Sequence, residues 1–209
     1  MNEPRWLTLS RELQALSQTG LAFSRDPYDR ERYETLRDLA SRFMAEHSAA
    51  DAQVIADLFR HEKGYATPKI DVRAAVFNSS SRILMVREAM DHGRWTMPGG
   101  WADVNITAAE CAVKEAREES GYEVRVRKLA AAWDHQRQGH PPTLSSCLKI
   151  YFLCELTGGE ARTSMETTEV RWFGKDEIPQ DLSLGRVLPK QIARMFEHAA
   201  NPRLPTDFD

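Results

Sequence analysis

The chain changes its hydrophobic period close to Pro68, and this change constrains the fold more than any other feature of the sequence. Before Pro68, apolar residues recur with the spacing of an amphipathic helix. After it, short runs rich in β-branched and aromatic residues are separated by turn residues, as strands are. With 209 residues, the chain is long enough for a domain of ordinary size and a small second one. We therefore predict two domains, residues 1–67 and residues 68–209.

The first domain is predicted to be all-helical. A first helix has leucines at helical spacing and can stop at Gly20. A second begins where Asp26 precedes Pro27, a capping residue followed by a proline at the first helical position, and runs to about His47. A third ends near Gly64, and the segment after it has the Gly and Pro of a linker.

The apolar stripes of these short helices cannot bury much surface by themselves. Up to Pro68 the sequence has nine Lys or Arg and eleven Asp or Glu, whereas a DNA-reading helical module is normally basic. We therefore expect the helical faces to pack on a second copy of the chain and to give a homodimer. The residues expected at that interface are Leu36, Phe43, Leu58 and Phe59.

The second domain is predicted to be a mixed sheet with helices on both faces, an α/β/α layering. Its strand-like runs are IDVRAAVF, RILMVRE, WTMP, EVRVRKLAAAW, CLKIYFLCEL and EVRWFG. One helix is expected over TAAECAVKEAREES, which begins with a Thr cap, and a final helix over about Arg186 to His198.

A formal net charge of −3 and a hydrophobic fraction of 42% are typical of a soluble globular protein and do not favour nucleic acid as a partner. The first residues carry charges and no continuous apolar stretch. They indicate neither a signal peptide nor a membrane span, and a cytoplasmic protein is expected. Cys111, Cys147 and Cys154 have no metal-type spacing and are expected to be buried free thiols.

Three glutamates share one face of the helix predicted in the second domain. Because Glu115, Glu118 and Glu119 stand at positions i, i+3 and i+4, their carboxylates project together and repel one another. A solvated acidic face is the common explanation for such a cluster. Mg²⁺ or Mn²⁺ prefers oxygen ligands and would remove the repulsion, so a metal site is the alternative.

The loop before this helix favours the metal site. Gly99 and Gly100 let the backbone turn tightly and offer a carbonyl to a metal or amides to a phosphate. Residues 100–122 resemble the Nudix box, the sequence signature of the Nudix hydrolases. The positions that match are Gly100, Glu115, Ala116, Glu118, Glu119, Gly121 and, at the last aliphatic position, Tyr122.

The resemblance extends to nearly the whole chain. Residues 14–46, and stretches between 71 and 174, are similar to a Nudix subgroup that includes CDP-choline pyrophosphatase. This similarity implies a Nudix α/β/α sandwich behind a helical dimerisation domain, and hydrolysis of a nucleoside diphosphate linked to another group, X. It implies CDP-choline, cleaved to CMP and phosphocholine, as the lead substrate. ADP-ribose or a nucleotide sugar is the alternative substrate, and a non-catalytic Nudix nucleotide sensor is the rival of another class.

Residue roles also follow from the resemblance. It implies that the Gly100 carbonyl, Glu115, Glu118 and Glu119 hold Mg²⁺ or Mn²⁺. Hydrolysis of a diphosphate needs neutralisation of its charge and a deprotonated water. Glu118 and Glu166 are the candidates for the group that takes the proton from this water.

Further predictions concern cationic and aromatic side chains. Arg73 and Arg87 could reach the diphosphate from strand positions, or could form structural ion pairs. His140 is expected to be a solvated loop residue. Tryptophans in or beside strands belong more often to the core than to a base-stacking site, and this applies to Trp95, Trp101 and Trp133.

The box departs from the family pattern at two positions. Ile106 replaces a glutamate and Lys114 replaces an arginine. Our hypothesis is that the missing pair has a structural role, because a buried arginine without its acid would be costly. Lys114 can place its ammonium in solvent or near a carbonyl, and Ile106 can cover the base of the loop, so the remaining acids could still hold the metal.

Overall fold

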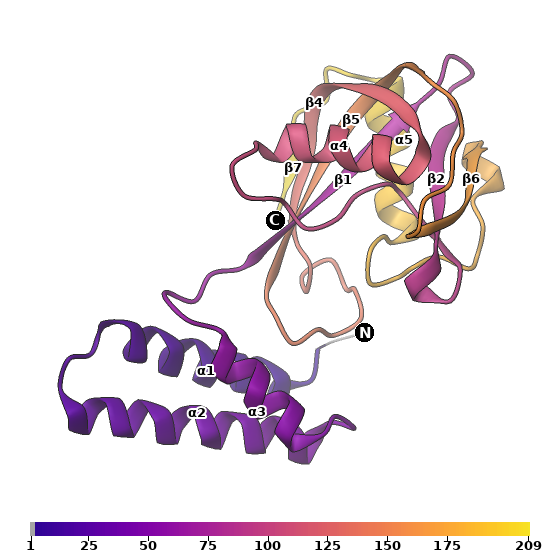
Figure 1. Ribbon diagram of the computed structural model, residues 1–209. Helices are drawn as coiled ribbons and strands as arrows, with labels where there is room; N and C mark the ends of the chain where they lie inside the picture. Colours follow the sequence, from indigo (N-terminus) through magenta and orange to yellow (C-terminus); the bar gives the residue numbers. More distant parts are fainter. Residues whose placement is uncertain (1–2) are drawn as a thin grey trace. The chain divides into compact units, whose positions relative to one another are not determined.

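The computed structural model describes residues 3–209, and they form two compact units (Figure 1). One unit contains the described residues up to Pro68 together with the segment Pro142–Ser146. The other contains Lys69–Pro141 and Cys147–Asp209. No helix in residues 3–209 is long and apolar enough to cross a bilayer.

The first unit consists of α1 (Arg5–Phe23), α2 (Pro27–His47) and α3 (Ala52–His61). α1 and α2 form a helical hairpin, and α3 packs against α2 (Figure 1). The carboxylate of Asp26 accepts hydrogen bonds from the backbone N–H groups of Tyr28 and Asp29, as the predicted cap requires. The core of this unit is small and is formed by Leu7, Ala40, Met44, Ile55 and Phe59.

Two details of this unit differ from the sequence prediction. Gly20 lies inside α1, where a Cβ atom would come within 2.4 Å of the Tyr33 ring, so this glycine allows close packing and does not stop the helix. Phe59 is buried in the core of the unit, so it is not available for an interface as predicted. Leu36 and Phe43 are partly buried, whereas Leu58 is exposed.

The segment Pro142–Ser146 belongs to the helical unit although it lies within the sequence of the other unit. The Arg11 guanidinium on α1 donates a hydrogen bond to the carbonyl of Thr143 over 2.9 Å. The sequence prediction divided the chain at a single point and did not anticipate this return of the chain, because a loop without hydrophobic periodicity does not indicate which unit it joins.

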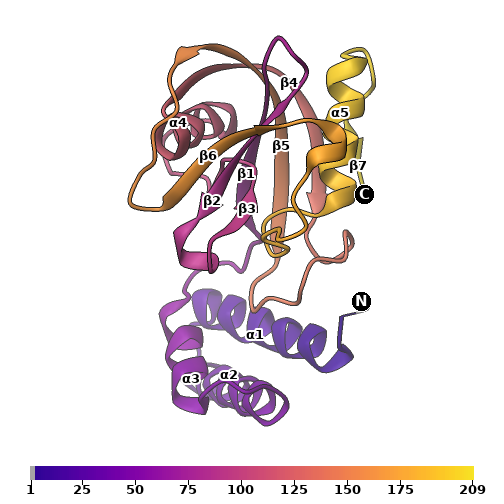
Figure 2. The same ribbon diagram turned by 90° about the vertical axis from the view of Figure 1, so that its right-hand side faces the viewer.

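The second unit contains a seven-stranded mixed sheet (Figure 2). Its main path runs β3-β2-β1-β5-β4-β7, and β6 pairs with β2. β1 and β5 pair in parallel, as do β4 and β7, and the other pairs are antiparallel. The strands are β1 (Lys69–Phe77), β2 (Ile83–Glu88), β3 (Arg94–Thr96), β4 (Tyr122–Asp134), β5 (Cys147–Gly159), β6 (Thr167–Phe173) and β7 (Asp207–Phe208).

One helix covers each face of this sheet, which confirms the predicted layering. α4 (Ala108–Ser120) packs on the face of β1 that carries Val72, Ala74 and Val76. α5 (Pro189–Ala200) packs on the other face, in the core cluster that contains Ala75. α5 starts three residues later than predicted, because Pro189 occupies its first turn. β7 was not predicted, since two residues give no periodic signal.

Replacing the cap of α2 should destabilise the helical unit. Asp26→Ala removes the acceptor for two backbone N–H groups and is expected to lower the free energy of unfolding by about 1 kcal/mol. Urea denaturation followed by circular dichroism measures this change. Asp26→Asn keeps an acceptor oxygen and is the matched control; an equal loss of stability in both variants would contradict the capping role.

Candidate active site

Capping contacts fix the residues at which α4, the helix that carries the three glutamates, begins and ends. Thr107 caps the helix, and its side chain and that of Glu110 exchange hydrogen bonds with each other's backbone N–H groups. Gly121 ends the helix with φ of +76°, and a Cβ there would lie 2.4 Å from the carbonyl oxygen of Glu160. The stretch Ala108–Ser120 is therefore a helix of defined length, and the three glutamates share one side of it as predicted.

The three carboxylates differ in their exposure to solvent. Glu119 is buried and accepts a hydrogen bond of 2.9 Å from the backbone N–H of Gly99. Glu115 is largely covered, with 13% of its side chain exposed, and Glu118 is open to solvent, with 58% exposed. The cluster therefore extends from the interior of the unit to its surface.

Neighbouring atoms lie so close to the backbone of Gly99 and Gly100 that a side chain at either position would crowd them. Gly99 has φ of +147°, and a Cβ at this position would lie 2.0 Å from the carbonyl oxygen of Val72. A Cβ on Gly100 would lie 3.2 Å from a carboxylate oxygen of Glu115. The Gly100 carbonyl accepts a 2.8 Å hydrogen bond from Val72 N–H, which leaves one lone pair on this oxygen for another partner.

Glu166 lies in a loop that is fixed by its backbone. Its N–H donates to the Ser164 hydroxyl oxygen over 3.1 Å, and its carbonyl accepts from Ala89 N–H over 2.8 Å. The side chain is exposed, and its charge is near enough to raise the pKa of Glu115. The structure therefore brings Glu166 into the electrostatic neighbourhood of the acidic face of α4.

Lys114 differs from the sequence prediction because its ammonium has an acidic partner. It is 2.6 Å from a carboxylate oxygen of Asp103, 3.5 Å from Glu118 and 3.9 Å from Glu115. Ile106 is exposed and does not cover the base of the loop as predicted. Asp103 and Lys114 thus connect the loop to α4 by an ion pair, with the acid three residues before the position expected from the family pattern.

The raised pKa values of Glu119 and Glu115 show that this site favours their uncharged forms. Burial raises the pKa of Glu119 to about 8, against the opposing effects of Arg73 and the Gly99 N–H. Burial also raises the pKa of Glu115; Lys114 opposes this shift, whereas Glu118 and Glu166 add to it. The hydrogen bond from Lys114 to Asp103 raises the pKa of Lys114.

The donor set fits a hard divalent cation. Ligand atoms of Asp103, Cys111 and Glu115 all lie within 4.8 Å of one another, and Glu115 lies against the backbone of Gly100. Carboxylate and carbonyl oxygens are the preferred ligands of Mg²⁺ and Mn²⁺. The Cys111 thiol is less suitable, because burial raises its pKa. The oxygen donors around Gly100 therefore form the candidate metal centre.

The two arginines predicted to contact substrate are engaged with protein groups. Arg73 is buried, pairs with the Asp71 carboxylate over 2.6 Å and donates to the Met97 carbonyl. This is the structural ion pair that the sequence left open, and Asp71 also accepts a 2.8 Å bond from Lys149. Arg87 is partly exposed and lies 3.2 Å from Asp181 and 3.5 Å from Glu169. Neither guanidinium is without a protein partner.

His140 was predicted to be solvated, and this prediction is wrong. The side chain is buried, and burial lowers its pKa to about 4. Its Nδ1 lies 2.7 Å from the carbonyl oxygen of Leu184, and its Nε2 lies 3.0 Å from the Gln191 amide nitrogen. The ring stacks on that of His135 at a centroid distance of 4.4 Å. Only the fold brings these partners together, so local sequence gave no signal for them.

Two of the three tryptophans confirm the core interpretation, and one contradicts it. Trp95 and Trp133 are buried in the cluster between the sheet and α5. Trp101 directly follows Gly100 and is 57% exposed, although its backbone forms a β-bridge with Asp71. The three cysteines are buried and free, as predicted.

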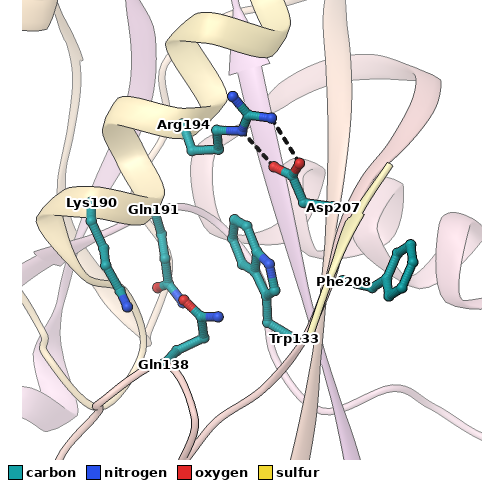
Figure 3. A pocket seen from close by; sticks show the side chains of 7 residues that line it. All are labelled: Trp133, Gln138, Lys190, Gln191, Arg194, Asp207 and Phe208. Atoms are coloured by element: carbon teal, nitrogen blue, oxygen red, sulfur yellow. Dashed lines mark hydrogen bonds and ion pairs between the residues drawn. The ribbon is translucent and has the colours of Figure 1, made fainter. Parts of the chain in front are cut away.

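A hollow of about 350 Å³ lies on the face of the sheet that α5 covers (Figure 3). Figure 3 shows Arg194 on α5 and Asp207 in β7 joined as an ion pair, with a contact of 2.7 Å, beside Trp133. α4 packs on the opposite face, so this hollow is separated by the sheet from the acidic cluster. The candidate active site is therefore the region of α4 and the glycine loop.

Comparisons with known proteins agree with this site. Residues 67–194 match the NUDIX domain model, and residues 4–59 match the model of a UDP-X-like N-terminal oligomerisation domain. Over 207 residues, 99% of this chain and 98% of the relative, the sequence is 42% identical to a Bacillus subtilis (strain 168) protein named "Putative ADP-ribose pyrophosphatase".

Solved structures give the same result. A UDP-X diphosphatase matches with a TM-score of 0.61 and 30% identity over 100% of both chains. An ADP-ribose pyrophosphatase from Streptococcus suis 89-1591 matches with a TM-score of 0.61 and 36% identity over 68% of this chain and 100% of its own.

The chain belongs to the Nudix family and is a pyrophosphohydrolase. A helical region that matches the UDP-X-like N-terminal oligomerisation domain precedes its Nudix domain, and the similarity to the Bacillus subtilis relative and to the UDP-X diphosphatase covers both parts. Nudix hydrolases generally use divalent cations, which agrees with the oxygen donors of α4 and the glycine loop.

Metal-free protein should lose stability as the pH rises from about 4.5 to about 8. The folded state raises the pKa of Glu119 from 4.5 to about 8, so over this range it retains a proton that the unfolded chain has released. The stabilisation is complete below the unfolded pKa and is lost as the pH passes the folded pKa. Each pKa unit corresponds to about 1.4 kcal/mol, so a loss of a few kcal/mol is expected.

The measurement is chemical denaturation in EDTA at several pH values, with Glu119→Gln as the matched control. The glutamine is always neutral, so the difference in stability between the two proteins should change over this pH range. A difference that stays constant would show that the Glu119 pKa is not raised.

Proposed function

We propose that this chain hydrolyses a uridine diphosphate linked to a second group, X, to give UMP and X-phosphate, with Mg²⁺ or Mn²⁺ as cofactor. The observation that carries the proposal is the buried-to-exposed series of carboxylates on α4 beside the Gly99–Gly100 loop. The choice of UDP-X is supported by the helical-domain family and by the full-length similarity to a UDP-X diphosphatase.

ADP-ribose is the second candidate substrate. It is favoured by the name of the Bacillus subtilis relative and by the solved Streptococcus suis enzyme. The relatives and structures compared above do not favour CDP-choline, which was the lead substrate expected from the sequence. The base pocket and the X-group pocket depend on side chains outside the box, so the box residues do not discriminate among these substrates.

In the proposed site, Glu115, Glu118, Glu119 and the Gly100 carbonyl hold the cation. When bound, the divalent ion supplies positive charge that neutralises the diphosphate and acidifies water. Glu119 is oriented by the Gly99 N–H, and Glu115 is positioned against Gly100, where any side chain would crowd it. These contacts place the carboxylates before substrate arrives, which reduces the reorganisation needed during the reaction.

Glu166 is our candidate for the general base, with Glu118 as the other carboxylate considered. A water oxygen attacks one phosphorus atom, the bridging P–O bond breaks, and the bridging oxygen leaves with the other phosphate. Glu166 accepts a proton from the attacking water and then releases it to solvent. The exposed side chain and pinned backbone of Glu166 suit this task, whereas Glu118 is assigned to the cation.

The substrate class is tested by ³¹P NMR of reactions with UDP-glucose, ADP-ribose and CDP-choline, each with Mg²⁺ and with Mn²⁺. We expect cleavage between the phosphorus atoms, with the highest kcat/KM for UDP-glucose; a higher kcat/KM for ADP-ribose would favour the second candidate. Glu115→Gln and Glu119→Gln should each lower kcat at least roughly a hundredfold, because each removes one charged ligand and keeps the shape. Glu123→Gln, an exposed change on β4, is the matched control.

Near-normal turnover in both ligand variants, at saturating metal, would refute the assignment of these residues. Preferential cleavage of CDP-choline would reinstate the substrate expected from the sequence. Absence of cleavage for all three compounds would refute the proposed substrate class.

We also propose that the helical unit forms a homodimer. The match to an oligomerisation domain supports an oligomer, and the unit exposes several large apolar side chains. Leu16, Leu39, Val54 and Leu58 are each between 46% and 61% exposed. Covering these side chains with a second copy of the chain would remove apolar surface from water, which stabilises the dimer.

Substitutions on this surface should dissociate the dimer. Val54→Asp and Leu58→Asp place charges among the exposed apolar residues and should give monomers in sedimentation velocity at micromolar concentration, where the wild type is a dimer. Met90→Asp, at an exposed methionine of the second unit, is the control and should remain dimeric. A wild-type monomer at this concentration would contradict the proposal.

A further inference from the structure

The outer face of α4 borders a hollow of about 490 Å³. We call it the α4 hollow, and its walls are Glu110, Val113, Lys114, Arg117, Glu118 and Arg162. Two of these residues, Lys114 and Glu118, also belong to the acidic cluster described above. The α4 hollow therefore begins where the proposed metal centre reaches the protein surface.

The charged groups of the α4 hollow differ in whether they have a partner within the protein. Glu110 is used by the helix cap, where its carboxylate accepts from the N–H and hydroxyl of Thr107 over 2.8 Å. Lys114 is paired with Asp103. By contrast, the guanidinium groups of Arg117 and Arg162 are exposed and make no ion pair or hydrogen bond with any residue in the described part of the chain.

The fold places these two arginines together from separate segments. Arg117 lies in the last turns of α4. Arg162 lies between β5 and β6, in a stretch that passes beside the end of α4, and its N–H donates to the Ser120 carbonyl over 2.9 Å (Figure 1). A Cβ on Gly121 would lie 2.8 Å from the Cβ of Arg162, so this approach is close.

A helix C-terminus accounts for only part of this arrangement. An arginine in the last turn of α4 interacts favourably with the helix dipole, and this explains Arg117 alone. It does not account for a second unpaired guanidinium that reaches the same hollow from another segment, on a chain with a formal net charge of −3. Two like charges on one wall repel unless an anion lies between them.

We propose that Arg117 and Arg162 recognise a negatively charged X group, so that the enzyme favours nucleoside diphosphate sugars whose sugar carries a carboxylate. This inference rests on the proposed function. Glu118 belongs both to the proposed metal centre and to the wall of the α4 hollow, so a substituent of a diphosphate held at that centre can enter the hollow. The planar guanidinium fork pairs with both oxygens of a carboxylate, and few uncharged groups fit it as well.

The test compares UDP-glucuronate with UDP-glucose, which differ only in a carboxylate or a hydroxymethyl group on the sugar. We expect the wild type to prefer UDP-glucuronate in kcat/KM. In Arg117→Gln/Arg162→Gln the ratio of the two kcat/KM values should fall at least tenfold, mainly through a higher KM for UDP-glucuronate, because charged hydrogen bonds to the sugar acid are lost. Each single variant should give part of this change.

Arg137→Gln, an exposed arginine outside the hollow, is the matched control and should keep the wild-type ratio. Product inhibition gives a second readout: glucuronate 1-phosphate should inhibit the wild type more strongly than glucose 1-phosphate, and the double variant should lose this difference. Thermal melting confirms that the variants are folded.

Three results would overturn the inference. A wild type without preference for the sugar acid, an equal loss for both substrates in the double variant, or an unchanged ratio each show that the α4 hollow does not select X groups. Cleavage of UDP-glucose or ADP-ribose without such selection leaves the proposed function standing. If none of these compounds is cleaved, the proposed function fails, and the inference fails with it.

Discussion

The repulsion among three carboxylates on one turn of α4 is the constraint on which the rest of this site depends. Free carboxylates at this spacing would favour separation into solvent, yet Glu119 is buried and Glu115 is nearly so. A backbone N–H from Gly99 and the ammonium of Lys114 provide partial compensation. The sheet, the caps of α4 and the glycine loop can be understood as the framework that keeps these acids close until a cation completes the neutralisation.

The departure of this chain from the Nudix box follows from the same electrostatic requirement. The box lacks a glutamate at Ile106, and the structure supplies an acid from Asp103 instead. Lysine suits this replacement, since its long stem can follow a carboxylate that is displaced along the loop, whereas an arginine fork requires a partner at a fixed position. The substitution at Ile106 therefore need not remove a ligand from the metal centre. It accompanies a different connection between the loop and the helix.

The layering of the second unit and the α4 acidic face could be predicted because they depend on periodicity and on residues close in sequence. The partners of Arg73 and His140 could not, since Asp71, Met97, Leu184 and Gln191 are brought to them only by pairing of strands and packing of α5. Position in a strand indicated that a guanidinium could point inward. It did not indicate whether a carboxylate or a substrate would meet it there.

The segment Pro142–Ser146 has a consequence for how such chains diversify. Because it joins the helical unit from within the sequence of the other unit, the two units are not exchangeable as consecutive modules. A recombination event near Pro68 that replaced the helices would leave Thr143 without the donor it has on Arg11. The fit of the helical unit therefore depends on a loop that is distant in the sequence, so an exchange of the helices would have to include residues 142–146 to keep this contact.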